Sequence, residues 1–170
     1  MRKLLIAGAV AGLMLVPGTS RAQLSVGAQG NWGSEFDWGV GGRVTLDLSP
    51  KRIPIAFFGT YDYFWPSSPL GINREYWELN FNAVYAQGVY GPQAQTYVGI
   101  GLNVAHPKGT AIATGETEED TNYGLNILGG TKYKLGRMAP YFEIRYTIEG
   151  SQQLILTLGV DLVLLGAERY

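Results

Sequence analysis

The sequence predicts an all-β protein: an eight-stranded antiparallel up-and-down transmembrane β-barrel that follows an N-terminal signal peptide. Two observations support this prediction, an apolar leader at the N-terminus and repeated alternation of apolar and polar residues through the rest of the chain. After residue 22 no segment shows a long apolar run, and none shows a convincing 3.6-residue period, so helices are not expected.

The N-terminal leader has the three parts of a secretory signal. Arg2 and Lys3 precede the uncharged stretch Leu4–Val16, and small residues follow up to Ala22. The apolar stretch is too short to cross a bilayer, which needs about 20 helical residues, and this disfavours the alternative of a retained membrane anchor. We therefore expect residues 1–22 to be a signal peptide removed on export.

The remaining residues, 23–170, are expected to form one outer-membrane β-barrel domain. The chain has no cysteine, which excludes a disulfide framework, a thiol nucleophile and cysteine-ligated metals. Of the 13 basic residues three precede residue 23, so ten remain against 14 acidic residues. Without a basic stripe, nucleic acid is not an expected partner.

Alternation at a period of two residues marks the strands. It is clearest near the C-terminus, where one face carries only aliphatic residues: Leu154, Leu156, Leu158, Val160, Leu162 and Leu164. Turn signals divide the chain into eight runs, each near the 9–11 residues that a tilted strand needs to cross a bilayer: 24–32, 38–48, 54–64, 76–86, 94–104, 122–133, 139–148 and 152–164.

The connections between these runs alternate in length. Short connections are predicted at 50–52, 87–93 and 134–138, and long ones at 65–75 and 105–121, with two further short loops at 33–37 and 149–151. Bacterial barrels place short turns on the periplasmic side and long loops outside. The predicted outer loops sum to a charge of −6 and the periplasmic turns to +4, so any recognition is expected at the acidic outer loops.

Aromatic residues mark the two membrane interfaces. All four tryptophans fall where strands meet the predicted outer loops, and we interpret them as an aromatic girdle: Trp32, Trp38, Trp65 and Trp77. Tyr63, Tyr123 and Tyr146 are expected beside them. A second group is expected lower on the barrel: Phe57, Tyr85, Tyr133 and Phe142.

The polarity of the two faces distinguishes this barrel from a soluble lipocalin-like barrel, which needs an apolar interior. With the leucine face outward, eight charged residues point inward: Arg43, Asp47, Asp62, Glu78, Lys132, Glu143, Arg145 and Asp161. Buried charges must pair, so we expect a lumen charge network in two clusters. One joins Lys132, Glu143, Arg145 and Asp161, and the other joins Arg43 to Asp62 and Glu78. Five apolar residues share the inward face: Phe58, Val84, Leu128, Ile155 and Val163.

The end of the chain resembles the small outer-membrane barrels of the OmpA transmembrane-domain and OmpX type. The segment Thr157–Leu164 is similar to the C-terminal signal of that class, with Thr157, Gly159, Leu162 and Leu164 as the matching positions, although the chain continues to Tyr170. The resemblance covers nearly all of residues 23–170. It implies residence in a Gram-negative outer membrane, contact with membrane lipids including lipopolysaccharide, and handling by periplasmic chaperones and the barrel-assembly machinery.

Function is expected to be structural or based on surface interaction, without a cofactor. Eight strands leave an interior that side chains fill, so no open pore is expected. Asp62 and Glu78 suggest acid–base chemistry, but a structural charge network accounts for them without a substrate cleft. The resemblance also implies an alternative, because small outer-membrane barrels include lipid A-modifying enzymes that act on acyl chains with a histidine. The candidate here is His106, which we expect to be a solvated loop residue just beyond the fifth strand.

Two remaining motifs have structural explanations. The acidic run Glu116–Asp120 lies in the longest predicted loop and is expected to be solvated, with a weak cation or partner contact as its functional alternative. The glycines at 39–42 and 99–101 do not indicate a nucleotide-binding loop, because no helix follows them. They are interpreted as strand glycines that make room for bulky neighbours.

Overall fold

The structure is a computed structural model of the chain. It describes the residues 22–48, 54–67, 72–88, 93–148 and 152–166. The predicted signal peptide, apart from Ala22, lies outside the described residues. No helix in the described part of the chain is long and apolar enough to cross a membrane.

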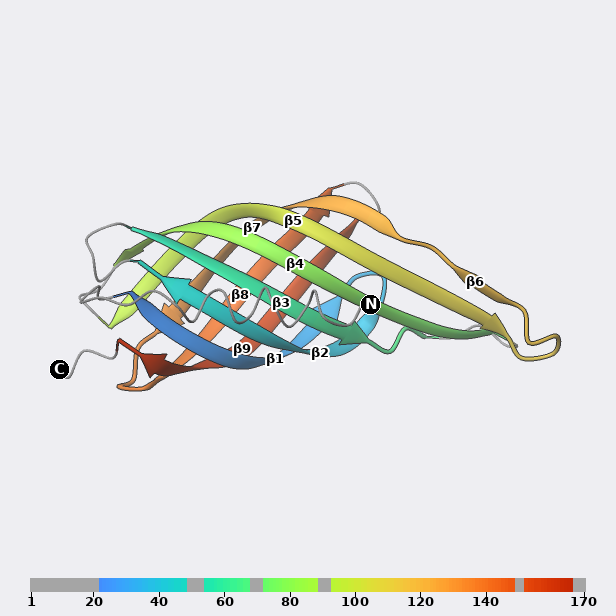
Figure 1. The fold of residues 1–170 in the computed structure, drawn as a ribbon, viewed down its shortest axis with the longest axis horizontal. Coiled ribbons are helices and arrows are strands. Elements are labelled where there is room, and N and C mark those ends of the chain that lie inside the picture. The colour runs from blue at the N-terminus through green and yellow to red at the C-terminus, as the bar shows by residue number, and fades with distance from the viewer. Residues whose placement is uncertain (1–21, 49–53, 68–71, 89–92, 149–151, 167–170) are drawn as a thin grey trace, which may run out of the picture.

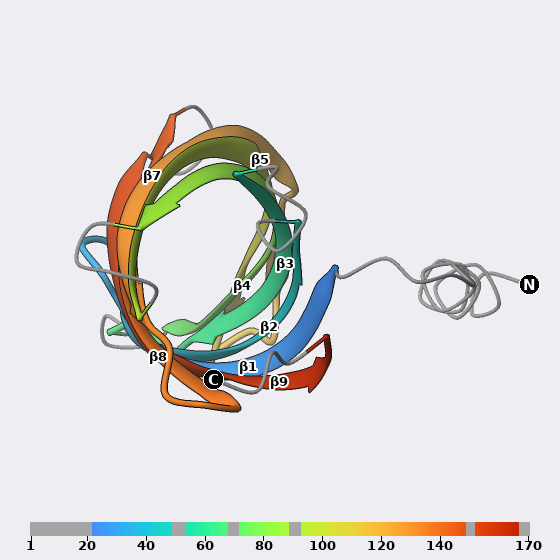
Figure 2. The same cartoon turned by 90° about the vertical axis from the view of Figure 1, so that its left-hand side faces the viewer.

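The described residues form nine antiparallel strands: β1 (Gln23–Gly33), β2 (Asp37–Asp47), β3 (Ile55–Phe64), β4 (Ile72–Gly88), β5 (Ala94–Ala111), β6 (Thr117–Glu119), β7 (Asn122–Tyr133), β8 (Met138–Ile148) and β9 (Gln153–Leu165). Eight of them close into a barrel, because β1 pairs with β9 and β4 pairs with β5. Figure 2 shows this ring from one end. The predicted fold class, a closed eight-stranded antiparallel barrel, is confirmed.

The side-chain alternation decides which face of each strand is buried. In β8, Glu143, Arg145 and Thr147 are fully buried, whereas Ile144 and Tyr146 between them are exposed. Aliphatic and aromatic side chains cover the outside of the other strands in the same way, including Val44, Phe81, Ile100, Ile127 and Leu158. The wall is therefore apolar outside and largely polar inside, the reverse of a soluble barrel.

Glycines in the wall make room for large inward side chains. A Cβ atom at Gly41 would collide with the carboxylate of Asp62 on the neighbouring strand. A Cβ atom at Gly130 would likewise meet the ring of Tyr97. These positions support the interpretation of the strand glycines as space for neighbours.

The expected boundaries of the fifth and fourth strands are wrong at the outer end. β4 begins at Ile72 and β5 continues to Ala111, so parts of both predicted long loops are strand. Lys108 to Thr110 of β5 also pair with β6. This outer extension, residues 72–75, 106–111 and 117–119, projects beyond the rest of the barrel in Figure 1. Backbone pairing continues there without the apolar alternation that a membrane imposes, and alternation alone therefore could not reveal it.

A register shift occurs at the opposite end of the barrel. Leu24 pairs with Leu165 but Ser25 pairs with Val163, so the β1–β9 ladder contains an irregularity there. Such a bulge locally bends and twists a strand. Leu164 is the extra residue of this irregularity, and both Leu164 and Leu165 are exposed.

Candidate functional site

The first group of charged residues lies in the half of the barrel nearer the outer extension. Asp62 of β3 and Glu78 of β4 are register partners, and Arg145 reaches them from β8 on the other side of the lumen. Its Nη2 atom lies 3.5 Å from Asp62 Oδ2 and forms an ion pair with Glu78 Oε1. All three side chains are completely buried. We call Asp62, Glu78 and Arg145 the upper cluster.

Neutral donors satisfy the carboxylates of the upper cluster. Asp62 accepts hydrogen bonds from Gln29 Nε2 at 2.6 Å, Asn31 Nδ2 at 2.7 Å and Thr60 Oγ1 at 2.8 Å. Glu78 accepts hydrogen bonds from several further side chains, at 3.0–3.3 Å: Tyr76, Asn80, Asn103 and Gln153. This network joins β1, β3, β4, β5 and β9, so it ties the two ends of the chain to the middle of the wall.

A second group lies further along the lumen. Arg43 Nη2 of β2 is 2.5 Å from Glu143 Oε2 of β8, and both side chains are almost completely buried. The Arg43 guanidinium lies between two rings, 3.9 Å from the centroid of Phe58 and 4.2 Å from that of Tyr141. Tyr97 donates a hydrogen bond of 2.9 Å to Glu143. We call Arg43, Glu143, Phe58, Tyr97 and Tyr141 the lower cluster.

Two further ion pairs lie near the end of the barrel that is opposite the outer extension. Lys132 Nζ is 2.5 Å from Asp161 Oδ2, and Lys134 Nζ is 3.8 Å from Asp47 Oδ2. Lys134 falls in a predicted turn, so the alternation within the strands does not identify it as a partner of Asp47.

The structure thus places all eight predicted residues of the lumen charge network inside, but with a different pairing. Arg145 was expected beside Glu143 and contacts Asp62 and Glu78; Arg43 was expected beside these acids and contacts Glu143. Strand neighbours do not decide the pairs because both arginines cross the lumen. The pairing of Lys132 with Asp161 is as expected.

Two clusters of buried apolar side chains accompany the charged groups. Toward the outer extension, Phe64, Tyr76, Ala105 and Ile155 form a fully buried cluster, and the ring of Phe36 stacks on Tyr76 at 3.7 Å between centroids. At the level of the lower cluster, six side chains form a second one: Ala56, Phe58, Val84, Ala86, Tyr97 and Leu128. Of the five apolar residues expected inside, all are buried.

His106 lies on the outer surface of β5, not in a loop. It is the register partner of Trp77 on β4, and the two rings stack at 5.0 Å between centroids. Its Nδ1 atom is 3.2 Å from Thr121 Oγ1, while its Nε2 atom is 3.9 Å from Glu119 Oε2. Glu119 is closer to Lys108 Nζ, at 3.3 Å. The expectation of a loop histidine is therefore wrong, because β5 extends past it.

Within the described residues, this arrangement gives His106 a hydroxyl partner but no carboxylate at hydrogen-bond distance. A hydrolytic triad needs the base to be oriented by a third group that bonds its other ring nitrogen. In the described ranges, no three histidine, cysteine, aspartate or glutamate side chains gather as potential metal ligands.

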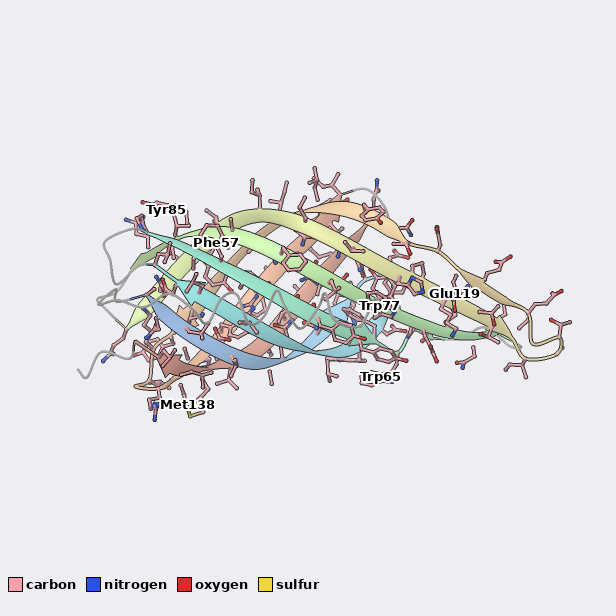
Figure 3. The ribbon with its side chains drawn as sticks, viewed as in Figure 1. Phe57, Trp65, Trp77, Tyr85, Glu119 and Met138 are labelled. Carbon is pink, nitrogen blue, oxygen red and sulfur yellow. The ribbon has the colours of Figure 1, made fainter. Side chains whose placement is uncertain are left out.

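The four tryptophans gather at the end of the barrel that carries the outer extension. Trp32 is the register partner of Trp38, and Trp77 that of Tyr63. Figure 3 shows Trp65 and Trp77 at this end, with Phe57, Tyr85 and Met138 toward the other. Trp38 and Trp65 are more than half exposed, as interface anchors would be.

The predicted assembly signal lies on β9. Thr157 is buried and points inward, whereas Leu162 and Leu164 are exposed on the outer face. Gly159 faces the ring of Tyr141, which leaves no room for a larger residue. The structure describes the chain as far as Gly166, so the last four residues lie outside the described part.

A closed eight-stranded wall that is apolar outside and ionic inside defines the class of small outer-membrane β-barrels. Comparison with solved structures gives the same fold. Neisserial surface protein A (NspA) is 15% identical with a TM-score of 0.59, over 87% of this chain and 100% of that one. Ail, the attachment invasion locus protein of Yersinia pestis, is 12% identical with a TM-score of 0.59, over 84% and 97%.

The N-terminal β-barrel domain of Pseudomonas aeruginosa OprF is 20% identical, with a TM-score of 0.57, over 84% of this chain and 99% of that domain. No protein-family model and no curated relative matches the sequence. The likeness to barrels of the OmpA and OmpX type, expected from the C-terminal segment, is thus confirmed at the level of the fold.

Proposed function

We propose that this chain is exported and resides in the bacterial outer membrane as a structural barrel whose outer end makes surface contacts. The observation that carries the proposal is the polarity of the wall, because exposed Leu158 and buried Thr157 are sequence neighbours with opposite environments. In this proposal residues 1–22 are the signal peptide and residues 23–170 the membrane domain. Membrane lipids surround the apolar band, with lipopolysaccharide at the tryptophan end.

Paired charges and apolar side chains at several levels of the lumen support a filled interior without an open pore. The assembly role of Thr157, Gly159, Leu162 and Leu164 is part of the same proposal, with periplasmic chaperones and the barrel-assembly machinery as partners. Ail and NspA are named as an attachment protein and a surface protein, and their shared fold supports a surface role for the outer end.

Gel migration tests membrane residence. Unboiled protein in detergent should migrate differently from boiled protein, and it should be extracted from outer membranes only with detergent. Leu158→Arg should lower the free energy of unfolding by about 2–4 kcal/mol, because a charge would face the lipid near mid-bilayer. Thr157→Ser is the matched control on the inner face and should change it little. Equal losses at both positions, or extraction without detergent, would contradict the proposal.

A lipid A-modifying enzyme remains the second candidate, because the Thr121 hydroxyl lies 3.2 Å from His106 Nδ1. We favour the non-enzymatic role, since Glu119 lies beyond hydrogen-bond distance and is paired with Lys108. Mass spectra of lipid A from cells with and without the protein should be identical. A change in acyl chains that His106→Asn abolishes, while the barrel still folds, would establish the enzyme instead.

A further inference from the structure

The outer end of the barrel contains a hollow of about 720 Å³, bordered by β4, β5, β6 and the turns after β1 and β3. This volume lies within the range of about 300–1,000 Å³ typical of ligand pockets. Most of its lining residues lie on the paired strands β4, β5 and β6 of the outer extension, and Figure 1 shows these strands at one end of the molecule. We call it the outer hollow.

Apolar side chains form one part of this lining. Phe36, Pro66, Ile72 and Pro107 all border the outer hollow. Phe36 is held by its stacking on the buried ring of Tyr76, with an interplanar angle of 7°. Ile72 is 38% exposed, so it has apolar surface left to cover. An apolar side chain bound here would therefore be removed from water, against a ring that its stacking already holds in place.

Carboxylates dominate the charged part of the lining. Glu75, Glu118, Glu119 and Asp120 oppose two bases, Arg74 and Lys108, which gives the hollow a formal charge of −2. The described outer end as a whole has seven acidic residues against those two bases, a net charge of −5: Glu35, Asp37, Glu75, Glu116, Glu118, Glu119 and Asp120. A field of this sign attracts cations and repels anions.

We propose that the outer hollow binds a cationic peptide segment that carries apolar side chains. Its lysine or arginine side chains lie against Glu118 and Asp120, and an apolar side chain covers Phe36 and Ile72. A bare metal ion or a polyamine matches the charge but leaves the apolar lining exposed to water. The cationic peptide would be the surface partner of the outer end. This proposal rests on the proposed function, which places the outer end outside the membrane.

Binding is measured on the folded barrel in zwitterionic detergent micelles, with empty micelles subtracted. The probe is a fluorescently labelled, end-blocked peptide of five residues that alternates lysine and phenylalanine, followed by anisotropy. Replacing both Glu118→Gln and Asp120→Asn should weaken binding about tenfold, since two favourable ionic contacts are lost. The matched control, Glu35→Gln with Glu116→Gln, removes the same charge outside the hollow and should weaken binding by no more than about twofold.

Two further measurements test the apolar part. Ile72→Ser should weaken binding about fivefold, in keeping with the loss of a partly buried aliphatic contact. A peptide with glycine in place of phenylalanine should bind about fivefold more weakly, for the same reason. The corresponding peptide with glutamate in place of lysine should not bind.

Each outcome decides between the proposals. Equal weakening by the two double variants would show that only the overall negative charge attracts the peptide, and would overturn the site. Undiminished binding of the glycine peptide or of the glutamate peptide would also overturn the site. A barrel that shows heat-dependent gel migration but binds none of the peptides overturns the hollow alone. A chain that never shows this migration overturns the proposed function, and the inference falls with it.

Discussion

The two buried arginines of the lumen are stabilised in different ways. Arg145 in the upper cluster has two carboxylate partners, Asp62 and Glu78, which in turn accept hydrogen bonds from neutral side chains. Arg43 in the lower cluster has one carboxylate, Glu143, and the faces of two aromatic rings. The stabilisation of Arg145 thus comes from two opposite charges. The stabilisation of Arg43 comes from one opposite charge and from the stacking of its planar guanidinium on aromatic rings.

Replacing either arginine should lower the free energy of unfolding more than any other single change in the two clusters, and the two losses should differ between the clusters. Arg145→Met leaves two buried carboxylates without a cation and should cost about 5 kcal/mol, whereas Arg43→Met leaves one and should cost about 3 kcal/mol. Urea unfolding of the barrel in lipid vesicles measures both. A wild-type urea midpoint for Arg145→Met would mean that the lumen is wet enough to screen charges, and would remove the argument against a pore.

A second change in the upper cluster should restore part of this loss. Glu78→Gln combined with Arg145→Met removes one of the stranded charges, and we expect recovery of about 1–3 kcal/mol relative to the single variant. The same glutamine placed at Glu143 with Arg145→Met is the control, because Glu143 is paired with Arg43. Recovery at Glu143 and none at Glu78 would contradict the observed pairing.

A charge-conserving change should have a smaller effect on the lower cluster. Arg43→Lys keeps the cation but loses the planar group between Phe58 and Tyr141, and should cost about 1–2 kcal/mol. In a Phe58→Leu background the same change should cost less, since one ring is already absent. An equal cost in both backgrounds, measured by urea unfolding, would show that the ring contact contributes nothing.

The smallest effect concerns an exposed carboxylate, as a contrast to the buried ones. Asp37, at the outer end of β2, accepts hydrogen bonds from Ser67 Oγ at 2.5 Å and from Ser67 N at 3.0 Å, which lower the pKa of its carboxyl group. Ser67→Ala should raise this pKa toward the ordinary value of about 3.9, as followed by NMR titration. The pKa of Asp37 is lower in the folded state than in the unfolded state. The hydrogen bonds from Ser67 therefore stabilise the loops fully at pH values above the unfolded pKa, and this stabilisation is lost as the pH falls through the folded pKa. An unchanged titration would contradict it.

The barrel wall could be predicted from the sequence because a membrane imposes a strict pattern on every strand. Seven of the eight runs begin within two residues of the observed strands, and the inward residues Asp62, Glu78 and Arg145 follow from alternation alone. The exception is β4, which starts at Ile72. There, as at Pro107 and Lys108 of β5, the strands leave the apolar band, and the alternation that revealed the wall is absent.

The partners inside the lumen could not be predicted for a geometric reason. Sequence order gives the neighbours of each strand, but strand tilt and stagger set which residues face each other across a barrel. Arg145 therefore meets Glu78 rather than Glu143, although Glu143 is only two residues away on β8. The aromatic partners of Arg43 were missed for the same reason, since Phe58 and Tyr141 come from separate strands.

The upper cluster also has a consequence for the order in which the barrel assembles. Asp62 and Glu78 come from β3 and β4, while their cation comes from β8 and further donors come from β1 and β9. An intermediate that placed β3 and β4 alone in lipid would carry two uncompensated anions, at a cost of several kcal/mol each. We therefore expect hairpins not to insert one after another: the first and last strands must join before the bilayer closes around the wall, so insertion and closure form a single kinetic step.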